Sequence, residues 1–414
     1  MQMCARGVSG LPEDGRSVVE RLKILFITSS YPTKEGPTLG VFVREHARAA
    51  ALRDDVIVLH CRSWAGGSHH RGAWGIEKET DEAITEGIPT YRVYSARWAV
   101  PGTSYLLFLW SIFRAFRRIV AGGFRPDVIH AHSYVVGVAA AIIAKLYGIP
   151  LVITEHSSAF LRKSLAGLEV SKARLAFRLA KVVMPVSGCL QRAIESTGIR
   201  ARFRVLPNVV DTALFRPNLA RRDGREPKRI LVVCLFSSGH TKGLPDLLNA
   251  LRGLGQRRDD WRLDVVGDGP VRGQYAKLAR DLGLDKKVTF HGQKPKQEVA
   301  EFMRQASLVV VSSPFETFSV VAAEALATGT PVLATRCGGP EEFVTNKVGL
   351  LVPKGDADAL CEGLDYMLDN LSSFLPAELC RHATERFSPE RVGQMLHSVY
   401  KACSRRRRVG HGPT

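Results

Sequence analysis

Short runs of apolar residues recur along the chain and alternate with longer amphipathic stretches. Runs that are apolar at nearly every position are typical of parallel strands buried on both faces. They predict strands at 22–28, 56–61, 127–132, 151–154 and 182–186, and again at 230–236, 263–267, 287–292, 307–312 and 331–335. Two tandem series of strands and helices predict an α/β fold with two Rossmann-like, doubly wound domains that face one another across a cleft.

The segments with helical periodicity complete this arrangement. They predict helices at 41–52, 103–120, 137–147, 188–196, 245–255, 271–282, 298–305, 356–369 and 389–403, whereas the polar stretch 63–86 is expected to be irregular. A basic stretch rich in turn-forming residues, 216–228, is interpreted as a linker. We therefore place the first domain at 21–215, the second at 229–385, and a final helical segment at 386–403.

The composition indicates which partners the protein favours and in which cellular compartment it is expected. The chain has 414 residues, of which 58 are Lys or Arg and 40 are Asp or Glu, so its formal charge of +18 favours anionic partners. Eight scattered cysteines without a C-x-x-C pair argue against a zinc or dithiol site and favour a reducing cytoplasm. Residues 1–20 lack the apolar core of a signal peptide, and no apolar run reaches the ~20 residues of a membrane span. We expect a cytoplasmic protein, soluble or peripheral.

Candidate chemistry concentrates in segment 312–342, where Glu316 and Glu324 are separated by seven residues. Glu316 follows a Ser-Ser-Pro loop, and Glu324 lies in an Ala-rich run expected to be helical. Eight helical steps span ~12 Å, beyond the roughly 5–9.5 Å of glycosidase acid–base pairs. The two carboxylates therefore suit two ends of a longer ligand, at a loop and helix N-terminus of the kind that binds phosphate. The alternative is two ordinary solvated acids.

This segment resembles the Glu–seven residues–Glu signature of the retaining glycosyltransferases of family 4, which have the GT-B fold. The stretches 126–133 (PDVIHAHS), 205–215 (VLPNVVDTALF) and 265–270 (VVGDGP) occur in the family's order, and the resemblance covers nearly all of 23–401. It implies that Glu316 binds hydroxyls of the donor sugar and that Glu324 binds the nucleotide ribose. It also implies that the last helix crosses back onto the first domain.

The resemblance implies further donor contacts. Lys242 would neutralise the donor diphosphate, and the other implied donor-site positions are Gly40, Gly267, Gly269, Phe318, Ser319, Gly338 and Gly339. Two departures stand out. The family usually has an Arg six residues before this Lys, and Ser238, His240 and Arg336 are the candidates to replace it. Ser319 stands where the family commonly has Gly, although its amide and that of Phe318 can still cap a phosphate.

On the acceptor side, the resemblance places His156 near the transferred sugar and the loop ending at Gly40 beside the donor phosphate and acceptor. His130 and His132 are interpreted as mainly structural. No H-x-x-x-H helix spacing occurs, so we expect no metal site. Asp356-Ala357-Asp358 is interpreted as a helix cap rather than a metal-binding motif. The expected catalytic residues are Glu316, His156 and Lys242.

The function implied is metal-independent, retaining transfer of a hexosyl group from a UDP- or GDP-linked sugar, without a cofactor. The acceptor would be a hydroxyl of a glycan, a lipid-linked or a small molecule, in surface polysaccharide or glycoconjugate biosynthesis. Alternatives are a sugar-nucleotide epimerase or phosphorylase of the same architecture, or a non-catalytic nucleotide- or nucleic-acid-binding protein; no nucleic acid is expected. Helix 103–120, aromatic and Arg-rich, is interpreted as a core helix, with docking on an anionic inner plasma-membrane face as the alternative.

Overall fold

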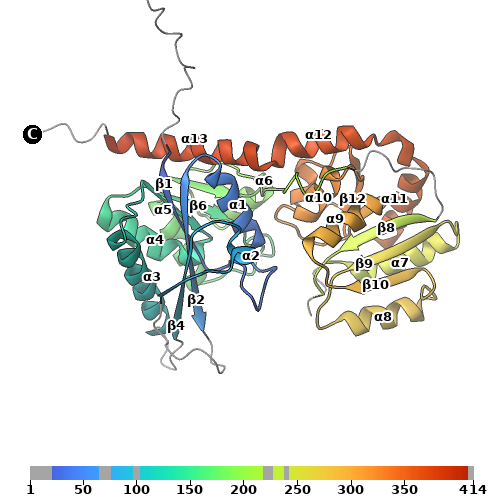
Figure 1. Ribbon diagram of the computed structural model, residues 1–414. Coiled ribbons are helices and arrows are strands. Elements are labelled where there is room, and N and C mark those ends of the chain that lie inside the picture. Colours follow the sequence, from blue (N-terminus) through green and yellow to red (C-terminus); the bar gives the residue numbers. More distant parts are fainter. Residues whose placement is uncertain (1–20, 65–75, 97–102, 218–226, 237–241, 409–414) are drawn as a thin grey trace, which may run out of the picture.

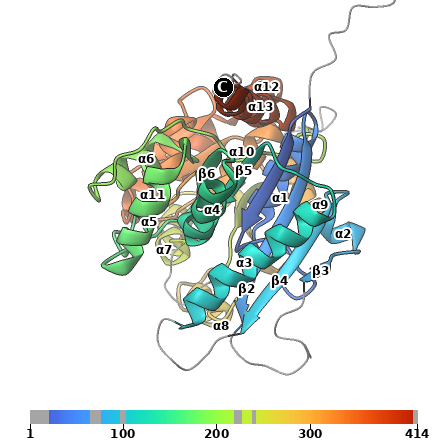
Figure 2. The ribbon, with the colours of Figure 1, turned by 90° about the vertical axis from the view of Figure 1, so that its left-hand side faces the viewer.

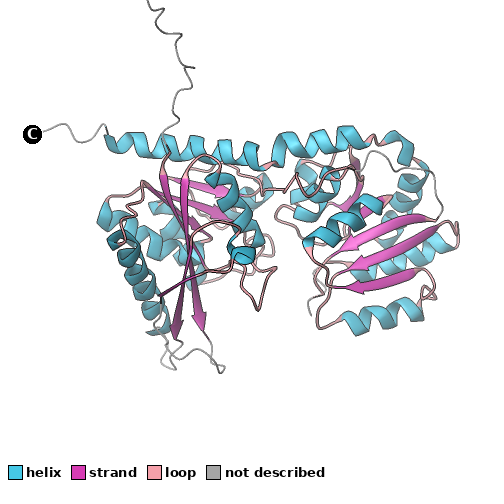
Figure 3. Ribbon diagram, in the orientation of Figure 1, coloured by secondary structure: helices cyan, strands magenta, loops and turns pink. Residues whose placement is uncertain are grey.

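The computed structural model describes residues 21–64, 76–96, 103–217, 227–236 and 242–408. Two α/β domains lie side by side, and the last two helices run along both of them (Figure 1). Helices flank the strands of each sheet (Figure 3). The predicted fold class, two doubly wound domains, is confirmed by the two parallel sheets.

The first domain is built on a seven-stranded sheet in the order β3-β4-β2-β1-β5-β6-β7, parallel except for β3. Its strands are β1 (Lys23–Thr28), β2 (Asp55–Trp64), β3 (Ile76–Lys78), β4 (Thr90–Ala96), β5 (Val128–His132), β6 (Leu151–Glu155) and β7 (Val182–Pro185). Its helices are α1 (Val41–Ala51), α2 (Glu82–Thr85), α3 (Thr103–Ala121), α4 (Tyr134–Tyr147), α5 (Leu168–Leu179) and α6 (Gly188–Glu195).

Strand β1 explains the continuous apolar runs. Leu25 and Ile27 belong to the core cluster that includes residues of α3 and α4, whereas Ile24 and Phe26 belong to the cluster that includes residues of α1 and the C-terminal helix. All four side chains are fully buried. Because successive side chains point to opposite faces, a strand covered on both sides must be apolar throughout.

The second domain is built on an all-parallel six-stranded sheet in the order β10-β9-β8-β11-β12-β13. Its strands are β8 (Lys228–Val233), β9 (Trp261–Val266), β10 (Val288–Gly292), β11 (Leu308–Val311), β12 (Val332–Thr335) and β13 (Gly349–Val352). Its helices are α7 (Leu244–Gly255), α8 (Arg272–Asp281), α9 (Lys296–Gln305), α10 (Val320–Ala327), α11 (Ala357–Asp369) and α12 (Pro376–Phe387), with 3-10 turns at Gly339–Glu342 (η1) and Leu371–Ser373 (η2). From β8 the strands run to one edge of the sheet through β9 and β10, and from β11 they run to the other edge through β12 and β13. The loops that follow β8 and β11 therefore lie side by side, at the kind of position where open α/β sheets bind ligands.

The last helix, α13 (Pro389–Arg408), packs on α1 of the first domain, as the resemblance implied. It continues past residue 403, where we expected it to end. Tyr400 is fully buried, and its hydroxyl lies 2.7 Å from Nδ1 of His130. Gly393 permits the helix crossing, because a Cβ there would lie 2.2 Å from the carbonyl oxygen of Ala49.

Several sequence expectations need correction. The stretch 63–86 is not simply irregular, because it holds the end of β2, strand β3 and helix α2. Strands β4 and β13 and helices α5 and α12 were not predicted. Strand β8 begins inside the expected linker, at Lys228. The described cysteines are all free thiols, and within the described residues no helix is long and apolar enough to cross a membrane.

Helix α3 is also more exposed than a core helix. Phe108, Ile112 and Phe116 are buried against the sheet, but Trp110 is 50% exposed and Leu106 is 66% exposed. Figure 2 shows α3, α4 and α5 on the side of the first domain that faces the viewer. One side of α3 therefore belongs to the core and the other presents apolar side chains to the surroundings.

Candidate functional site

Lys242 and Glu316 meet at the reversal point of the second sheet. Lys242 precedes α7 and Glu316 lies in the loop between β11 and α10; Nζ of Lys242 donates to Oε1 of Glu316 at 2.7 Å. The hydroxyl of Ser313 donates to the same oxygen at 2.8 Å, and that of Ser312 donates to the Lys242 carbonyl at 3.0 Å. The Lys242 side chain is 35% exposed to solvent. The ammonium is thus held by Glu316 but remains accessible to an incoming anion.

The glycines expected at the donor site share one property. At each, an added Cβ would lie within 3 Å of another segment's backbone: Gly40 against Ser30, Gly267 against Cys234, Gly269 against Phe236, Gly338 against Glu316 and Gly339 against Phe318. At Gly267 the φ angle is also positive, at 138°, and the Cβ would lie 1.7 Å from the Cys234 carbonyl oxygen. Close packing of neighbouring loops is therefore enough to explain why glycine stands at these positions. Contact of these glycines with a nucleotide stays a prediction.

Helix α10 begins under strain at Ser319, its N-cap. Ser319 has a φ of 71° and no side-chain capping bond, and the left-handed region is costly for residues other than glycine. Its neighbour Phe318 is buried, with ring centroids 5.4 Å from Phe343 and 5.1 Å from Phe387. The phenylalanine anchors the loop, which leaves the backbone amides as the groups available to a phosphate. The helix begins only at Val320, so the ~12 Å expected from eight helical steps does not apply to this pair.

Glu324 is a buried carboxyl close to the interface between the domains. Its side chain lies on α10, and the residue is 8% exposed. Burial raises the pKa of Glu324 to about 7, against an opposing effect of Lys296. Nζ of Lys296 also bonds Oε1 of Glu45 on α1 at 3.1 Å, which joins the two domains. Glu324 therefore lies among charges contributed by both domains.

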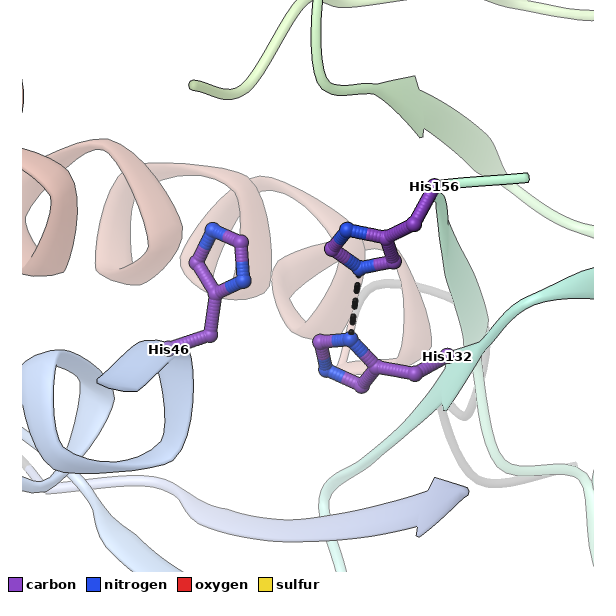
Figure 4. Close-up of side chains that lie close together, drawn as sticks. All are labelled: His46, His132 and His156. Atoms are coloured by element: carbon purple, nitrogen blue, oxygen red, sulfur yellow. Dashed lines mark hydrogen bonds between the residues drawn. The ribbon is translucent and has the colours of Figure 1, made fainter. Parts of the chain in front are cut away.

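Three histidines gather in the first domain (Figure 4). His46 comes from α1, His132 ends β5, and His156 follows β6. Nδ1 of His132 lies 3.2 Å from Nε2 of His156, and Nε2 of His46 lies 3.0 Å from the carbonyl oxygen of Pro207. Burial lowers the pKa of all three, that of His46 to about 4, so the imidazoles are neutral at pH 7.

Both histidines that were interpreted as mainly structural are buried. His132 also contacts His156, the residue expected to face the sugar. His130 is fully buried and bonded to the hydroxyls of Tyr400 and Thr154, each at 2.7 Å. The helix-spacing rule missed the cluster because its members lie on three separate segments. The signal available in the sequence was that His132 ends one strand and His156 directly follows the neighbouring parallel strand.

The remaining sequence candidates have mixed outcomes. Oδ1 of Asp356 accepts the amide of Ala359 at 2.9 Å, which confirms the capping interpretation. Arg336 is 3.9 Å from Glu341, and its side chain is 57% exposed. Ser238 and His240 lie outside the described residues.

Glu342 is a contact that sequence reasoning missed. Its carboxylate accepts the amides of Gly188 at 2.9 Å and Cys189 at 2.6 Å, at the start of α6 in the other domain. Helix N-termini attract carboxylates because their first amides are unpaired. A cavity of about 280 Å³ lies alongside, lined by residues of both domains that include Phe318 and Met395. Together with the Lys296–Glu45 bond, this contact joins the two domains.

Comparison with known proteins places this geometry among sugar-transferring enzymes. Residues 39–214 match the family described as Glycosyltransferase Family 4, and residues 215–386 match Glycosyl transferases group 1. A D-inositol 3-phosphate glycosyltransferase of Acidothermus cellulolyticus is 31% identical over 318 residues, 68% of this chain and 68% of that protein. One from Pseudarthrobacter chlorophenolicus is 32% identical over 265 residues, 59% of this chain but only 63% of that protein.

Solved structures share the fold at lower sequence identity. The Anabaena protein Alr3699/HepE, solved in complex with UDP, has a TM-score of 0.72 and 22% identity, and the match covers 92% of this chain and 100% of that one. A match over this share of the chain includes both domains.

Proposed function

Because this chain belongs to glycosyltransferase family 4, with the GT-B fold, we propose that it transfers a hexosyl group from a nucleotide-diphosphate sugar with retention of anomeric configuration. The observation that carries the proposal is the Lys242–Glu316 pair at the β8–β11 reversal. UDP in the Anabaena relative supports a uridine nucleotide as donor, with a GDP-linked sugar as the second candidate. The acceptor is a hydroxyl of a glycan, a lipid-linked or a small molecule in surface polysaccharide or glycoconjugate assembly.

The Lys242–Glu316 ion pair supports separate roles for its two members, with Lys242 acting on the diphosphate and Glu316 on the sugar. A diphosphate entering the cleft brings negative charge, which draws the Lys242 ammonium away from Glu316. The ammonium then stabilises charge that develops on the leaving phosphate. Glu316, released from the pair, accepts a hydrogen bond from a sugar hydroxyl. Glu324 binds the ribose, and the amides at the start of α10 bind the α-phosphate.

The chemical step needs no protein nucleophile. The bond from the anomeric carbon to the phosphate oxygen breaks, and the acceptor oxygen bonds that carbon on the same face. The acceptor's proton passes to the leaving phosphate. His156 positions the sugar by hydrogen bonding, for which a neutral imidazole suffices. Lys242 and the helix amides replace a divalent cation, so activity should survive excess chelator.

The test compares turnover with nucleotide affinity. A thermal-shift screen of nucleotide sugars finds the donor, and NMR of the product reports the anomeric configuration. Glu316→Ala should lower turnover by roughly 100-fold or more, in line with loss of a transition-state contact, and leave diphosphate affinity nearly unchanged. Glu378→Ala, at an exposed acid on α12, is the matched control. Equal losses of turnover and affinity, or an inverted product, would contradict the proposal.

We further propose that the first domain docks on an anionic membrane from the cytoplasmic side. The support is a group of exposed apolar side chains on three neighbouring helices: Leu106 and Trp110 on α3, Ile142 and Leu146 on α4, and Leu168, Leu175 and Leu179 on α5. Arginines 114, 117 and 118 lie on the same α3. Apolar insertion combined with basic residues is typical of interfacial helices.

Vesicle co-sedimentation tests this second proposal. Binding should occur to vesicles containing anionic lipid and not to neutral ones. Leu106→Ser with Trp110→Ser should weaken it without large loss of stability, because both side chains are at least half exposed. Leu375→Ser, at an equally exposed leucine of the second domain, is the control. Equal binding by the variant and the control would refute docking through α3.

A further inference from the structure

The histidine cluster has more nitrogen atoms than hydrogen-bond partners. A carbonyl oxygen only accepts, so Nε2 of His46 carries the proton that Pro207 accepts, and Nδ1 carries a free lone pair. This Nδ1 is buried and has no partner within the described residues, and the same is true of Nε2 of His132. Buried polar atoms are rarely left unpaired, so such atoms call for an explanation.

The arrangement of the rings suggests what can satisfy Nδ1 of His46. In Figure 4 a nitrogen of His46 faces the two other rings across a gap. One nitrogen from each histidine can be chosen so that all three lie within 4.8 Å of one another. Within the cluster Nδ1 of His132 and Nε2 of His156 are already 3.2 Å apart. Ligand nitrogens at about 2.0–2.1 Å from a tetrahedral zinc ion are roughly 3.3 Å apart.

We propose that His46, His132 and His156 form a binding site for a transition-metal dication of the Zn²⁺ class, with one imidazole nitrogen from each as ligand. Small rotations of the rings close the remaining distance. The Pro207 carbonyl supports His46 as outer partners of metal-bound histidines do, by fixing the tautomer through the other ring nitrogen. His156 is the one partly buried member of the set, so water can complete the coordination from its side.

The ligand chemistry selects the ion. Neutral imidazoles bind Zn²⁺, Co²⁺, Ni²⁺ and Cu²⁺, whereas Mg²⁺ and Ca²⁺ prefer oxygen ligands. No carboxylate belongs to the set, so Mg²⁺ should not compete. A bound metal would occupy the His156 imidazole that the proposed function assigns to the sugar, and zinc would therefore inhibit transfer. That consequence rests on the proposed function, but the binding measurement below does not.

The experiment uses the full chain after chelator treatment and dialysis. Co²⁺ titration should produce the visible absorption bands of a tetrahedral site with one ion per chain, and Zn²⁺ but not Mg²⁺ should displace the cobalt. His46→Gln and His132→Gln should each lower Co²⁺ affinity by more than the roughly 10–100-fold that loss of an outer partner costs. Circular dichroism establishes that the variants are folded.

His291→Gln is the matched control, because His291 is partly buried and bonded to Asp264 in the other domain. It should bind cobalt as the unchanged chain does. Absence of stoichiometric cobalt binding by the unchanged chain would overturn the proposal. So would binding that persists in the folded His46 and His132 variants, since the ion would then be held elsewhere.

Discussion

At the scale of single residues, Glu324 links stability to pH. Its pKa of about 7, raised from 4.5 by burial, means that the folded protein holds this proton more tightly than the unfolded chain does. The stability it contributes is complete below pH 4.5 and is lost as the pH rises through about 7. Above pH 7 the buried carboxyl is ionised, and this lowers the free energy of unfolding by at most about 3 kcal/mol.

Glu324→Gln removes this cost because the amide stays neutral. The variant should match the unchanged protein near pH 4.5 and exceed it in unfolding free energy by up to about 3 kcal/mol at pH 8. Urea unfolding at both pH values measures the difference. An equal effect at the two pH values would mean that the carboxyl does not titrate as the burial predicts.

The same substitution should weaken nucleotide binding. If the carboxylate accepts a ribose hydroxyl, its loss costs about 1.5–3 kcal/mol, as for hydrogen bonds to charged groups. Calorimetry with the free nucleoside diphosphate at pH 8 measures this. A folded variant with unchanged affinity would show that Glu324 does not contact the ribose.

Ser319→Gly should stabilise the protein. The left-handed φ of 71° costs serine energy that glycine does not incur, and the side chain forms no cap. We expect a gain of about 1 kcal/mol in unfolding free energy. Ser187→Ala is the control of opposite sign, because Ser187 caps α6 by accepting the Leu190 amide at 3.1 Å; its loss should cost about 1 kcal/mol. Destabilisation by Ser319→Gly would reveal a contact of the hydroxyl that matters.

The sequence predicted residues whose role depends on local pattern and missed those whose role depends on assembly. Glu316, Glu324, Gly338 and Gly339 stand in one motif, so the motif located them together. The Lys242–Glu316 pair and the histidine cluster form only when strands far apart in the chain become neighbours. Reasoning from strand ends could have joined His132 to His156, but not to His46 on a helix.

At the scale of elements, predictability followed burial. Strands covered on both faces were predicted because every position is apolar. Strand β4 was missed because its sequence TYRVYSA alternates with polar residues, as suits a strand beside the short edge strand β3. Helix α12 was missed because only Leu379, Ala383 and Phe387 are buried in it.

Two helical glycines should respond to alanine in opposite directions. Gly393 on α13 lies against Ala49, where a Cβ would be 2.2 Å from the carbonyl oxygen, so Gly393→Ala must push α13 away from α1. Gly273 in the first turn of α8 has nothing within 4 Å, so Gly273→Ala should stabilise by up to about 1 kcal/mol through helix propensity. We expect Gly393→Ala to destabilise by roughly 1–3 kcal/mol, as overpacking does. Stabilisation by both would show that α13 does not pack closely in solution.

At the scale of the whole molecule, the C-terminal helix belongs to the first domain in space but follows the second in sequence. Val392, Leu396, Val399 and Tyr400 are buried and belong to the core cluster on the α1 face of the first sheet. His397 adds a bond of 2.9 Å to the buried Asp54. The two domains are therefore joined by a chain segment that the first domain needs for its core, besides the contacts through Glu342 and Lys296.

This arrangement predicts how fragments fold. A fragment of residues 21–217 lacks α13 and exposes the apolar face that α13 covers, whereas 227–387 retains its whole sheet and all its helices. Because burying one large apolar side chain contributes about 1.5–3 kcal/mol, losing four costs about 6–12 kcal/mol, which is comparable with the whole stability of a typical domain. The first fragment should aggregate or unfold non-cooperatively, and the second should show a cooperative transition.

A peptide of residues 388–408 added to the first fragment should restore cooperative unfolding, and the same peptide with Tyr400→Asp and Leu396→Asp should not. Cooperative unfolding of 21–217 alone would mean that α13 is held by the first domain without being required for its core.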